Sequence, residues 1–335
     1  MKKIPLCFVL VFFLLSCQQK PDTYYISFGG FTQGTTYSIT YESPDSIVYK
    51  PEVEDLLANF DSSLSTYNPK SVITKINNNQ SDLTDEYLQT VLIKADEIYQ
   101  QTRGAFDITV APLVNAWGFG FNNKEGVTNS MIDSILEFVG FKKISYYDSV
   151  IIKSDPRIMI DMNAIAQGYS VDVVAAFLEE RGIENYLVEI GGEVKTRGVN
   201  SKQKPWRIGI DKPEDNNMVP GAKLQAIVTL ADKSLATSGN YRRFYERNGV
   251  KYSHTIDPKT GYPVTHSLLS ATVIANDCMT ADAYATAFMV MGLEKAYELA
   301  LKLQDVEAYF VYNDTSGLFQ VKATPGMEEQ IEEVK

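Results

Sequence analysis

Apolar and polar positions alternate with a period of two in many short stretches of the chain. The stretches "YYISFGG" and "TTYSITY" predict a pair of β-strands joined around Gly29 and Gly30. Similar strands are predicted in "RIMIDM", on both sides of the Gly-Gly turn in "NYLVEIGGEVKTRGV", and in "WRIGI", "LQAIVTL", "SLLSATVIA", "EAYFVY" and "LFQVK". Their grouping into hairpin-like pairs favours antiparallel sheet.

Other stretches have the 3.6-residue spacing of helices. Residues 85–102 carry apolar side chains on one face and are followed by Gly104. Further helices are predicted over residues 51–60, 131–139, 164–181, 278–291 and 293–303, and the acidic end, residues 326–335, is expected to be a frayed tail. Separate helices and strand pairs indicate an α+β fold in one large domain of two closely packed lobes, not a regular βαβ array.

One predicted helix carries an unusual pair of polar side chains. The stretch "ADAYATAF" is rich in Ala and lacks Pro and Gly, yet it contains Asp282 and Thr286. Residues four apart lie on the same helix face, one turn from each other. Two oxygen ligands are therefore expected to be stacked on an otherwise apolar helix.

The composition limits the classes of ligand. The chain has 335 residues, of which 44% are hydrophobic and 22% charged, as in ordinary globular proteins. The net charge of −11 argues against nucleic acid as a partner. There is no zinc-binding Cys/His pattern, no Walker A motif, no G-x-S-x-G and no complete Rossmann fingerprint. The remaining ligands are oxygens, from Asp282, Thr286 and backbone carbonyls, and these suit Mg²⁺.

The N-terminus predicts export from the cytoplasm. Two lysines and about a dozen apolar residues form a signal peptide over residues 1–16, too short to span a membrane. Cys17 follows Leu-Leu-Ser, as at a bacterial lipoprotein processing site, and lipidation there would anchor the protein to a membrane. The alternative is an ordinary secretory signal with a chance cysteine. Cys278 is then the one cysteine left in the folded part, and a buried core thiol is expected.

Two glycine-containing stretches allow both a functional and a structural interpretation. Gly191 and Gly192 in "VEIGGEV" could cradle a phosphate with exposed N–H groups or form a plain hairpin turn. The helix that starts in "IDMNAIAQGYSVD" could bind an anion at its N-terminus, or Asp161 and Asn163 could simply cap it.

Two further stretches also allow both a functional and a structural interpretation. His254, just before "TIDPKTGYP", is suited to proton transfer near neutral pH or is a structural histidine. Asp107 interrupts the apolar run "GAFDITVAPLVNAWGFG", in which Trp117 and its neighbours form either tight core packing or the wall of a ligand site.

Taken together, the motifs resemble the ApbE family, the FAD:protein FMN transferases once described as thiamine-biosynthesis lipoproteins. The likeness covers residues 31–308. It rests on eight stretches in order: "QGTTY", "LSTYNPKSVITKIN", "GAFDITVAPLVNAWGFG", "IDMNAIAQGYSVD", "VEIGGEVKTRG", "LATSGNYRRF", "HTIDPKTGYPV" and "ADAYATAFMVMG".

The resemblance implies a T-fold-like architecture of antiparallel sheet with helices packed on one face. It places the transferase domain at residues 31–322, after a tether and first strand at residues 17–30 and before an acidic tail at residues 323–335. It also implies Mg²⁺-dependent transfer of FMN from FAD to a Ser or Thr hydroxyl, with release of AMP. The acceptors would be flavoprotein subunits of membrane redox complexes, modified on the extracytoplasmic, periplasmic side of the cell envelope. Two alternatives are an FAD pyrophosphatase that yields FMN and AMP, and a non-catalytic flavin-binding lipoprotein.

The same resemblance assigns residues to the site. Asp282, Thr286 and the carbonyl of Ala164 match metal ligands, and His254 matches the base that accepts the proton of the acceptor hydroxyl. The expected contacts to FAD are Tyr67, Asp107, Ala164, Gln167, Gly191, Gly192, Glu193, Thr237, Ser238, Gly239, His254 and Ile256.

Two positions depart from the family pattern. Gln167 stands where the family often has Lys, and Gln33 where it often has Met. The first removes a positive contact to FAD and is expected to influence the balance between transfer and hydrolysis.

Overall fold

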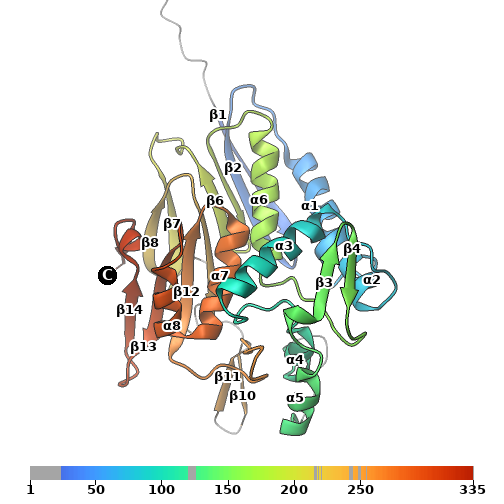
Figure 1. The fold of residues 1–335 in the computed structure, drawn as a ribbon. Helices are drawn as coiled ribbons and strands as arrows, with labels where there is room; N and C mark the ends of the chain where they lie inside the picture. The colour runs from blue at the N-terminus through green and yellow to red at the C-terminus, as the bar shows by residue number, and fades with distance from the viewer. Residues whose placement is uncertain are drawn as a thin grey trace, which may run out of the picture.

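The computed structural model describes residues 24–119, 126–214, 217, 219, 221–240, 244–247, 250–253 and 255–334. Its centre is an eight-stranded sheet in the order β1-β2-β5-β6-β9-β12-β13-β14, in which every neighbouring pair is antiparallel (Figure 1). The strands are β1 (Tyr24–Thr32), β2 (Thr35–Ser43), β5 (Tyr186–Ile190), β6 (Glu193–Arg197), β9 (Ser234–Gly239), β12 (Leu268–Ala275), β13 (Glu307–Asn313) and β14 (Phe319–Ala323).

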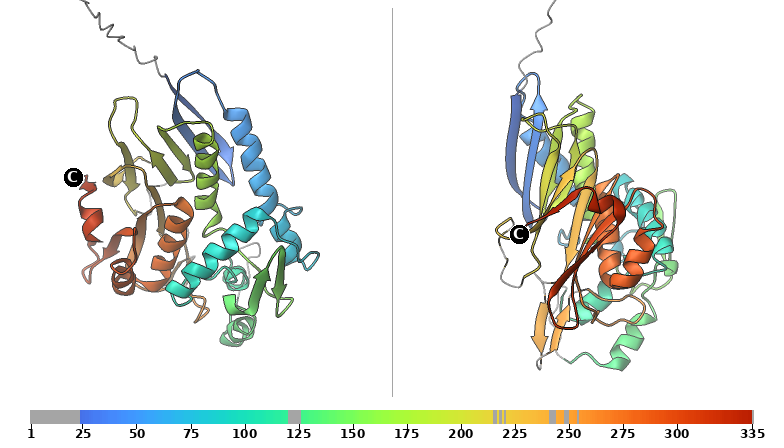
Figure 2. Two further views of the ribbon diagram at one scale, coloured as in Figure 1. Left: turned by 45° about the horizontal axis from the view of Figure 1, so that its top comes forward. Right: turned by 90° about the vertical axis from the view of Figure 1, so that its left-hand side faces the viewer.

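Helices cover one face of this sheet (Figure 2). They are α1 (Lys50–Leu64), α2 (Val72–Asn77), α3 (Glu86–Gln101), α6 (Ala166–Glu179), α7 (Cys278–Met291) and α8 (Leu293–Ala300). Part of the opposite face packs against a three-stranded sheet of β7 (Trp206–Asp211), β8 (Leu224–Leu230) and β15 (Ile331–Glu333), together with α9 (Pro325–Glu328). The α+β fold with helices on one face of an antiparallel sheet is confirmed.

The central strands are buried on both faces, which explains their nearly continuous apolar runs. In β13, Ala308 and Phe310 pack into the helix-covered core, whereas Tyr309 and Val311 pack against the small sheet. Alternate residues of a strand point to opposite faces, so each residue of this run is buried on one side or the other.

The remaining short elements lie outside the main sheet (Figure 1). They are α4 (Ala111–Ala116), α5 (Asn129–Leu136), the 3-10 turn Phe141–Lys143, the hairpin of β3 (Ile144–Tyr147) and β4 (Val150–Lys153), and the hairpin of β10 (Phe244–Arg247) and β11 (Val250–Ser253). Most of these elements were not predicted, because they are too short for a clear periodicity.

The first hairpin turns four residues later than predicted. Gln33 and Gly34 form the turn with positive φ angles of 51° and 76°, and Gly29 and Gly30 lie inside β1. A Cβ atom on Gly29 would lie 2.7 Å from the carbonyl oxygen of Tyr37, and one on Gly30 would lie 2.6 Å from the Tyr37 ring. The two glycines therefore permit a close approach of Tyr37 and do not mark a turn.

The predicted strand in "RIMIDM" is wrong. Residues 157–162 belong to no strand, and the side chain of Asn77 bonds to this segment as a neighbouring strand would. Its amide donates to the Ile160 carbonyl at 2.9 Å and its oxygen accepts from the Ile160 N–H at 2.8 Å. The Asp161 N–H donates to the Ile108 carbonyl at 2.7 Å, so the segment has partners without belonging to a sheet.

The predicted frayed tail is also wrong. Residues 325–333 form α9 and β15, and β15 pairs with β8 through Ile331 and Val228. Met327 is fully buried in the core between the two sheets. The high proportion of acidic residues led to the wrong prediction, because Met327 and Ile331 pack against apolar residues of the two sheets.

The helix predictions hold with shifted ends. Residues 85–102 form α3 with Asp85 as its N-cap, and residues 278–291 form α7. The helix expected at 51–60 runs on to Leu64, the one expected at 131–139 is α5 and ends at Leu136, and the one expected from residue 164 begins at Ala166. Within the described part of the chain, no helix combines the length and hydrophobicity needed to cross a bilayer. The predicted signal peptide and Cys17 lie outside the described residues.

Candidate active site

A cavity of about 450 Å³ opens where α7, the start of α6 and the end of β9 meet three loops. The loops contain Tyr67, residues 105–110 and residues 255–258, and Val114 of α4 and Phe119 also line the cavity. The lining combines apolar side chains with a few converging polar groups, as is usual for small-molecule sites. Among the described lining residues there is no Lys, Arg or His, whereas four carboxylates are present: Asp107, Asp161, Glu193 and Asp282.

The structure brings most of the predicted site residues to this cavity. Those that line it are Tyr67, Asp107, Ala164, Gln167, Glu193, Thr237, Ser238, Gly239, Ile256, Asp282 and Thr286. His254 lies outside the described residues, although Thr255 next to it lines the cavity. Several lining residues were not predicted as contacts, notably Gln33 and Met289. Nothing in the sequence distinguished Met289 from an ordinary core residue of its helix.

Helix α7 holds Asp282 in a buried position. The Asp282 side chain is 6% exposed, and its Oδ2 accepts a hydrogen bond from the Gly168 N–H of α6 at 3.0 Å. A Cβ atom on Gly168 would lie 2.4 Å from the Cys278 carbonyl oxygen, so only glycine lets the helices approach this closely. Burial raises the pKa of Asp282 to about 7, against the opposing effect of the Gly168 N–H. A bound cation would favour the charged carboxylate.

The N-terminus of α6 thus binds an anion, but the anion is a side chain of α7. Its N-cap residue, Ile165, provides no side-chain cap. Asp161 accepts from the Asn163 N–H at 2.8 Å, within the loop before the helix. The expectation that Asp161 or Asn163 caps α6 is therefore wrong.

The hydroxyl of Thr286 faces the end of β9. Its Oγ1 lies 3.2 Å from the Ser238 Oγ, and the neighbouring Thr237 hydroxyl pairs with Thr272 at 2.8 Å. Thr286 lines the same cavity as Asp282, one helical turn away, as the spacing predicted. The two oxygens can therefore reach one ligand.

The described residues fit a hard divalent cation and not a soft one. They contain no group of three or more His, Cys, Asp and Glu side chains that could hold a metal. A cation here would rely on a carboxylate, a hydroxyl and a backbone carbonyl, the oxygen ligands that Mg²⁺ accepts alongside substrate phosphates. Asp282, Thr286 and Ala164 line one cavity and provide these three types of oxygen.

Asp107 also lines the cavity, but its oxygens are used within the protein. Oδ1 accepts from the N–H and hydroxyl of Thr109 at 2.8 and 2.6 Å, and Oδ2 accepts from the Phe141 N–H at 2.9 Å. Burial raises the pKa of Asp107, and these hydrogen bonds act against the increase. The carboxylate ties the cavity loop to the 3-10 turn that begins at Phe141.

The Gly-Gly turn between β5 and β6 lies against the side chain of Gln167. The Gly191 N–H donates to the Thr36 carbonyl at 3.0 Å and the Gly192 N–H donates to Glu189 Oε1 at 2.8 Å, which favours a hairpin over a phosphate cradle. A Cβ atom on Gly191, whose φ is 68°, would lie 1.4 Å from Gln167 Nε2. This glycine therefore makes room for Gln167, which donates to the Ile190 carbonyl at 3.2 Å.

The aromatic stretch "WGFG" has two roles. Trp117 donates from Nε1 to the Gly261 carbonyl at 2.7 Å and packs against Tyr262, which joins the segments around residues 117 and 261. Phe119 lines the cavity. Both interpretations of this stretch, core packing and ligand wall, therefore apply to different residues.

Cys278 is a buried core thiol, as predicted. Its side chain is fully buried at the start of α7, and burial raises the pKa of the thiol well above its ordinary value.

His266 is the histidine that the structure describes. Its Nε2 lies 2.8 Å from the Met289 carbonyl near the end of α7.

Comparison with known proteins defines the class to which this fold and cavity belong. The family model described as "ApbE family" matches residues 33–310, and the chain belongs to this family. The FAD:protein FMN transferase of Vibrio cholerae serotype O1 is 38% identical over 296 residues, which cover 86% of this chain and 87% of that protein. The FAD:protein FMN transferase of Haemophilus influenzae is 35% identical over 320 residues, or 91% of this chain and 90% of that protein.

A solved structure agrees with the fold. The flavin transferase ApbE from Vibrio cholerae superposes with a TM-score of 0.82 at 34% identity, over 92% of this chain and all of that chain. The resemblance inferred from the eight motifs is thereby confirmed at the level of the whole domain.

Proposed function

We propose that this protein is an FAD:protein FMN transferase that moves FMN from FAD to a Ser or Thr hydroxyl of a flavoprotein, with Mg²⁺, outside the cytoplasm. The observation that carries the proposal is the cavity, in which Asp282 and Thr286 of α7 meet Ala164 and the end of β9. Membership of the ApbE family and the names of the relatives support the substrate and the reaction. The extracytoplasmic location rests on the signal peptide and on lipidation of Cys17, both of which stay sequence-based predictions.

The chain's own residues position the substrate. Asp282, Thr286 and the Ala164 carbonyl would hold Mg²⁺, which when bound neutralises charge on the pyrophosphate. The described lining contains no Lys, Arg or His, so within it this cation is the positive group that the phosphates can meet. Tyr67 and Phe119 provide aromatic surface for a flavin ring or an adenine.

Proton transfer from the acceptor hydroxyl is assigned to His254. The residues that follow it in the sequence, Thr255 and Ile256, line the cavity. Thr255 is itself held by a hydrogen bond from its hydroxyl to Asn240 at 2.7 Å. General base catalysis of this kind contributes roughly 10²–10⁴-fold to a rate.

The test uses the protein from residue 18 onward with FAD, Mg²⁺ and an acceptor flavoprotein domain. The intact mass of the acceptor is expected to increase by one FMN residue, with AMP released in equal amount, and EDTA should abolish the increase. FMN and AMP in solution with an unchanged acceptor would replace the proposal with FAD hydrolysis. Intact bound FAD would indicate a flavin carrier.

A further inference from the structure

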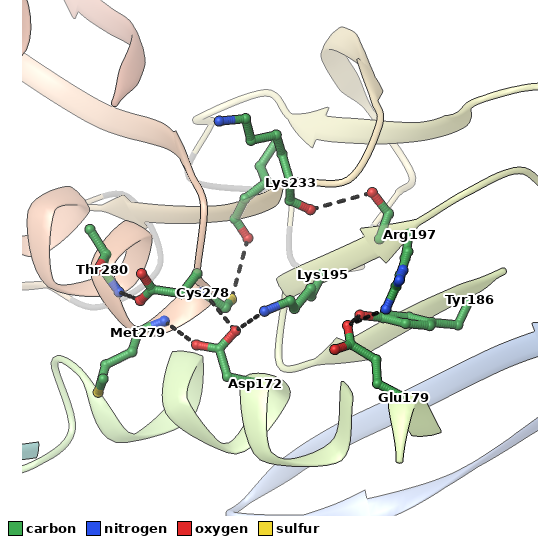
Figure 3. A network of polar contacts seen from close by, with 12 residues as sticks. Asp172, Glu179, Tyr186, Lys195, Arg197, Lys233, Cys278, Met279 and Thr280 are labelled. Carbon is green, nitrogen blue, oxygen red and sulfur yellow. Dashed lines mark hydrogen bonds and ion pairs between the residues drawn. The ribbon is translucent and has the colours of Figure 1, made fainter. Parts of the chain in front are cut away.

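A carboxylate of α6 holds the first turn of α7 from outside that helix. Asp172 Oδ1 accepts from the Cys278 N–H at 3.0 Å, and Oδ2 accepts from the Met279 N–H at 2.9 Å (Figure 3). The helix's own N-cap, Asp277, accepts from the Thr280 N–H at 2.8 Å. Two carboxylates therefore satisfy three of the N–H groups that a helix leaves unpaired at its start.

The Asp172 carboxylate is in turn held by Lys195 of β6. Lys195 Nζ lies 2.9 Å from Asp172 Oδ1, and the two side chains are only 21% and 14% exposed. Burial raises the pKa of Asp172, and the ion pair with Lys195 and the two N–H donors oppose that increase. Removing one partner of such a pair leaves a poorly solvated charge, so the remaining side chain must rearrange or lose its charge.

This contact and the Gly168–Asp282 hydrogen bond form a reciprocal clamp between α6 and α7. An α6 backbone N–H, from Gly168, binds an α7 carboxylate, and an α6 carboxylate, Asp172, binds α7 backbone N–H groups. Gly168 and Asp172 are four residues apart, so both contacts lie on the same face of α6. The register of the two helices is fixed at two points one turn apart.

We propose that Asp172 and Lys195 are positioning residues for the cation site of this enzyme. The oxygens assigned to the cation come from Ala164, just before α6, and from Asp282 and Thr286 on α7. Their spacing therefore depends on how the two helices are held together. The inference rests on the proposed Mg²⁺ site.

The chain offers a matched control on the same two elements. Arg197 of β6 pairs with Glu179 of α6 at 3.4 Å, but these side chains are 44% and 38% exposed. Tyr186 also donates to Glu179, and none of the contacts of this second pair reaches α7 in the described structure (Figure 3). A change at Arg197 therefore tests a β6–α6 ion pair that does not hold the cation-bearing helix.

The experiment measures Mg²⁺ binding by calorimetry on the whole mature chain without FAD, and thermal stability in EDTA. Lys195→Met and Asp172→Asn are expected to raise the Mg²⁺ dissociation constant about 10-fold or more, the size seen when an outer contact to a metal ligand is lost. Lys195→Arg should restore affinity close to the wild type, and Arg197→Met should leave it unchanged. FAD affinity in EDTA should be unchanged in all four variants.

Two outcomes would overturn the inference: wild-type Mg²⁺ affinity in both Lys195→Met and Asp172→Asn, or an equal loss in Arg197→Met. If Lys195→Met does not fold, Asp172→Asn decides, because it keeps the shape and one oxygen acceptor. Absence of Mg²⁺ binding by the wild type would refute the metal site itself, and that result is distinguishable because it appears before any variant is compared.

Discussion

Two walls of one cavity each carry a buried carboxylate, and the protein uses them differently. On the loop wall, Asp107 accepts hydrogen bonds from Thr109 and Phe141 with both of its oxygens. On the helix wall, Asp282 accepts one hydrogen bond among the described residues, from Gly168. An ionised carboxylate can accept about four hydrogen bonds, so Asp282 keeps acceptor capacity that Asp107 has mostly used.

The difference distinguishes a carboxylate bonded within the protein, Asp107, from the carboxylate that we propose as a metal ligand, Asp282. Both side chains are more than 90% buried and both line the cavity, so neither burial nor location distinguishes them. The two carboxylates differ in the number of hydrogen bonds that each accepts from groups within the protein. We therefore expect substitutions at Asp107 to affect the stability of the fold and those at Asp282 to affect the cation.

Asp282→Ala is expected to have the largest effect on function. Loss of the one carboxylate among the assigned ligands should reduce Mg²⁺-dependent FMN transfer by roughly 10³-fold, above the 10–100-fold typical of an outer contact to a metal ligand. The variant removes a poorly solvated buried charge but leaves the Gly168 N–H unpaired, and because these two effects oppose each other its melting temperature in EDTA should stay close to that of the wild type. Transfer rate against Mg²⁺ concentration and a thermal melt check both parts. Full activity at low Mg²⁺ would contradict the assignment.

Asp107→Ala should lower the stability of the fold and leave Mg²⁺ affinity unchanged, the opposite of the effects expected for Asp282→Ala. It removes three hydrogen bonds and leaves buried donors at Thr109 and Phe141 unpaired, which should cost about 3 kcal/mol of the free energy of unfolding. Denaturant unfolding measures the loss. The folded fraction should bind Mg²⁺ with wild-type affinity. A lower Mg²⁺ affinity with unchanged stability would reverse the roles of the two carboxylates.

Thr286→Val should weaken Mg²⁺-dependent transfer as Asp282→Ala does, but to a smaller extent. Valine keeps the shape but removes a neutral oxygen, so the Mg²⁺ concentration for half-maximal transfer should rise about 10-fold, or by about 1.4 kcal/mol. Thr90→Val on α3, whose hydroxyl bonds the Glu86 carbonyl, is a matched control and should have no effect on the Mg²⁺ requirement. An equal response of the two variants would exclude Thr286 as a ligand.

Gln167→Lys is expected to have the smallest effect. It would add the first cationic side chain to the described lining of a cavity with four carboxylates. FAD should bind a few-fold more tightly, since a partly exposed charge pair contributes about 0.2–1 kcal/mol. Quenching of flavin fluorescence measures the change, with Gln167→Met as the uncharged control of similar length. Weaker binding in the lysine variant would mean that the Gln167 amide itself is needed.

The sequence predicted those parts of the fold and site in which the signal is local. The stacked pair Asp282 and Thr286 was visible because helical spacing depends only on neighbours in the chain. The contacts that hold the pair were not, because Gly168, Asp172 and Lys195 meet α7 only after long-range packing. The same reason explains "RIMIDM", whose strand-like pattern could not reveal that Asn77 would occupy the place of a neighbouring strand.

Resemblance to a family gave the cavity residues more completely than periodicity did, but it did not separate their roles. Asp107 was carried over as a cofactor contact, and the structure places it in the wall with its oxygens directed to Thr109 and Phe141. Gly191 was carried over in the same way, and its positive φ and missing side chain make room for Gln167. Such distinctions depend on three-dimensional contacts that residue identity does not encode.

The pairing of β15 with β8 has a consequence for how the protein is made. Strand β15 and the buried Met327 follow in the chain all the strands that they cover, namely β8 and strands of the main sheet. A polypeptide that stops before residue 325 would leave this surface exposed to solvent, to other nascent chains and to proteases. Residues 325–333 thus complete the core between the two sheets, and a molecule that lacks them would present its unfinished core to chaperones and proteases.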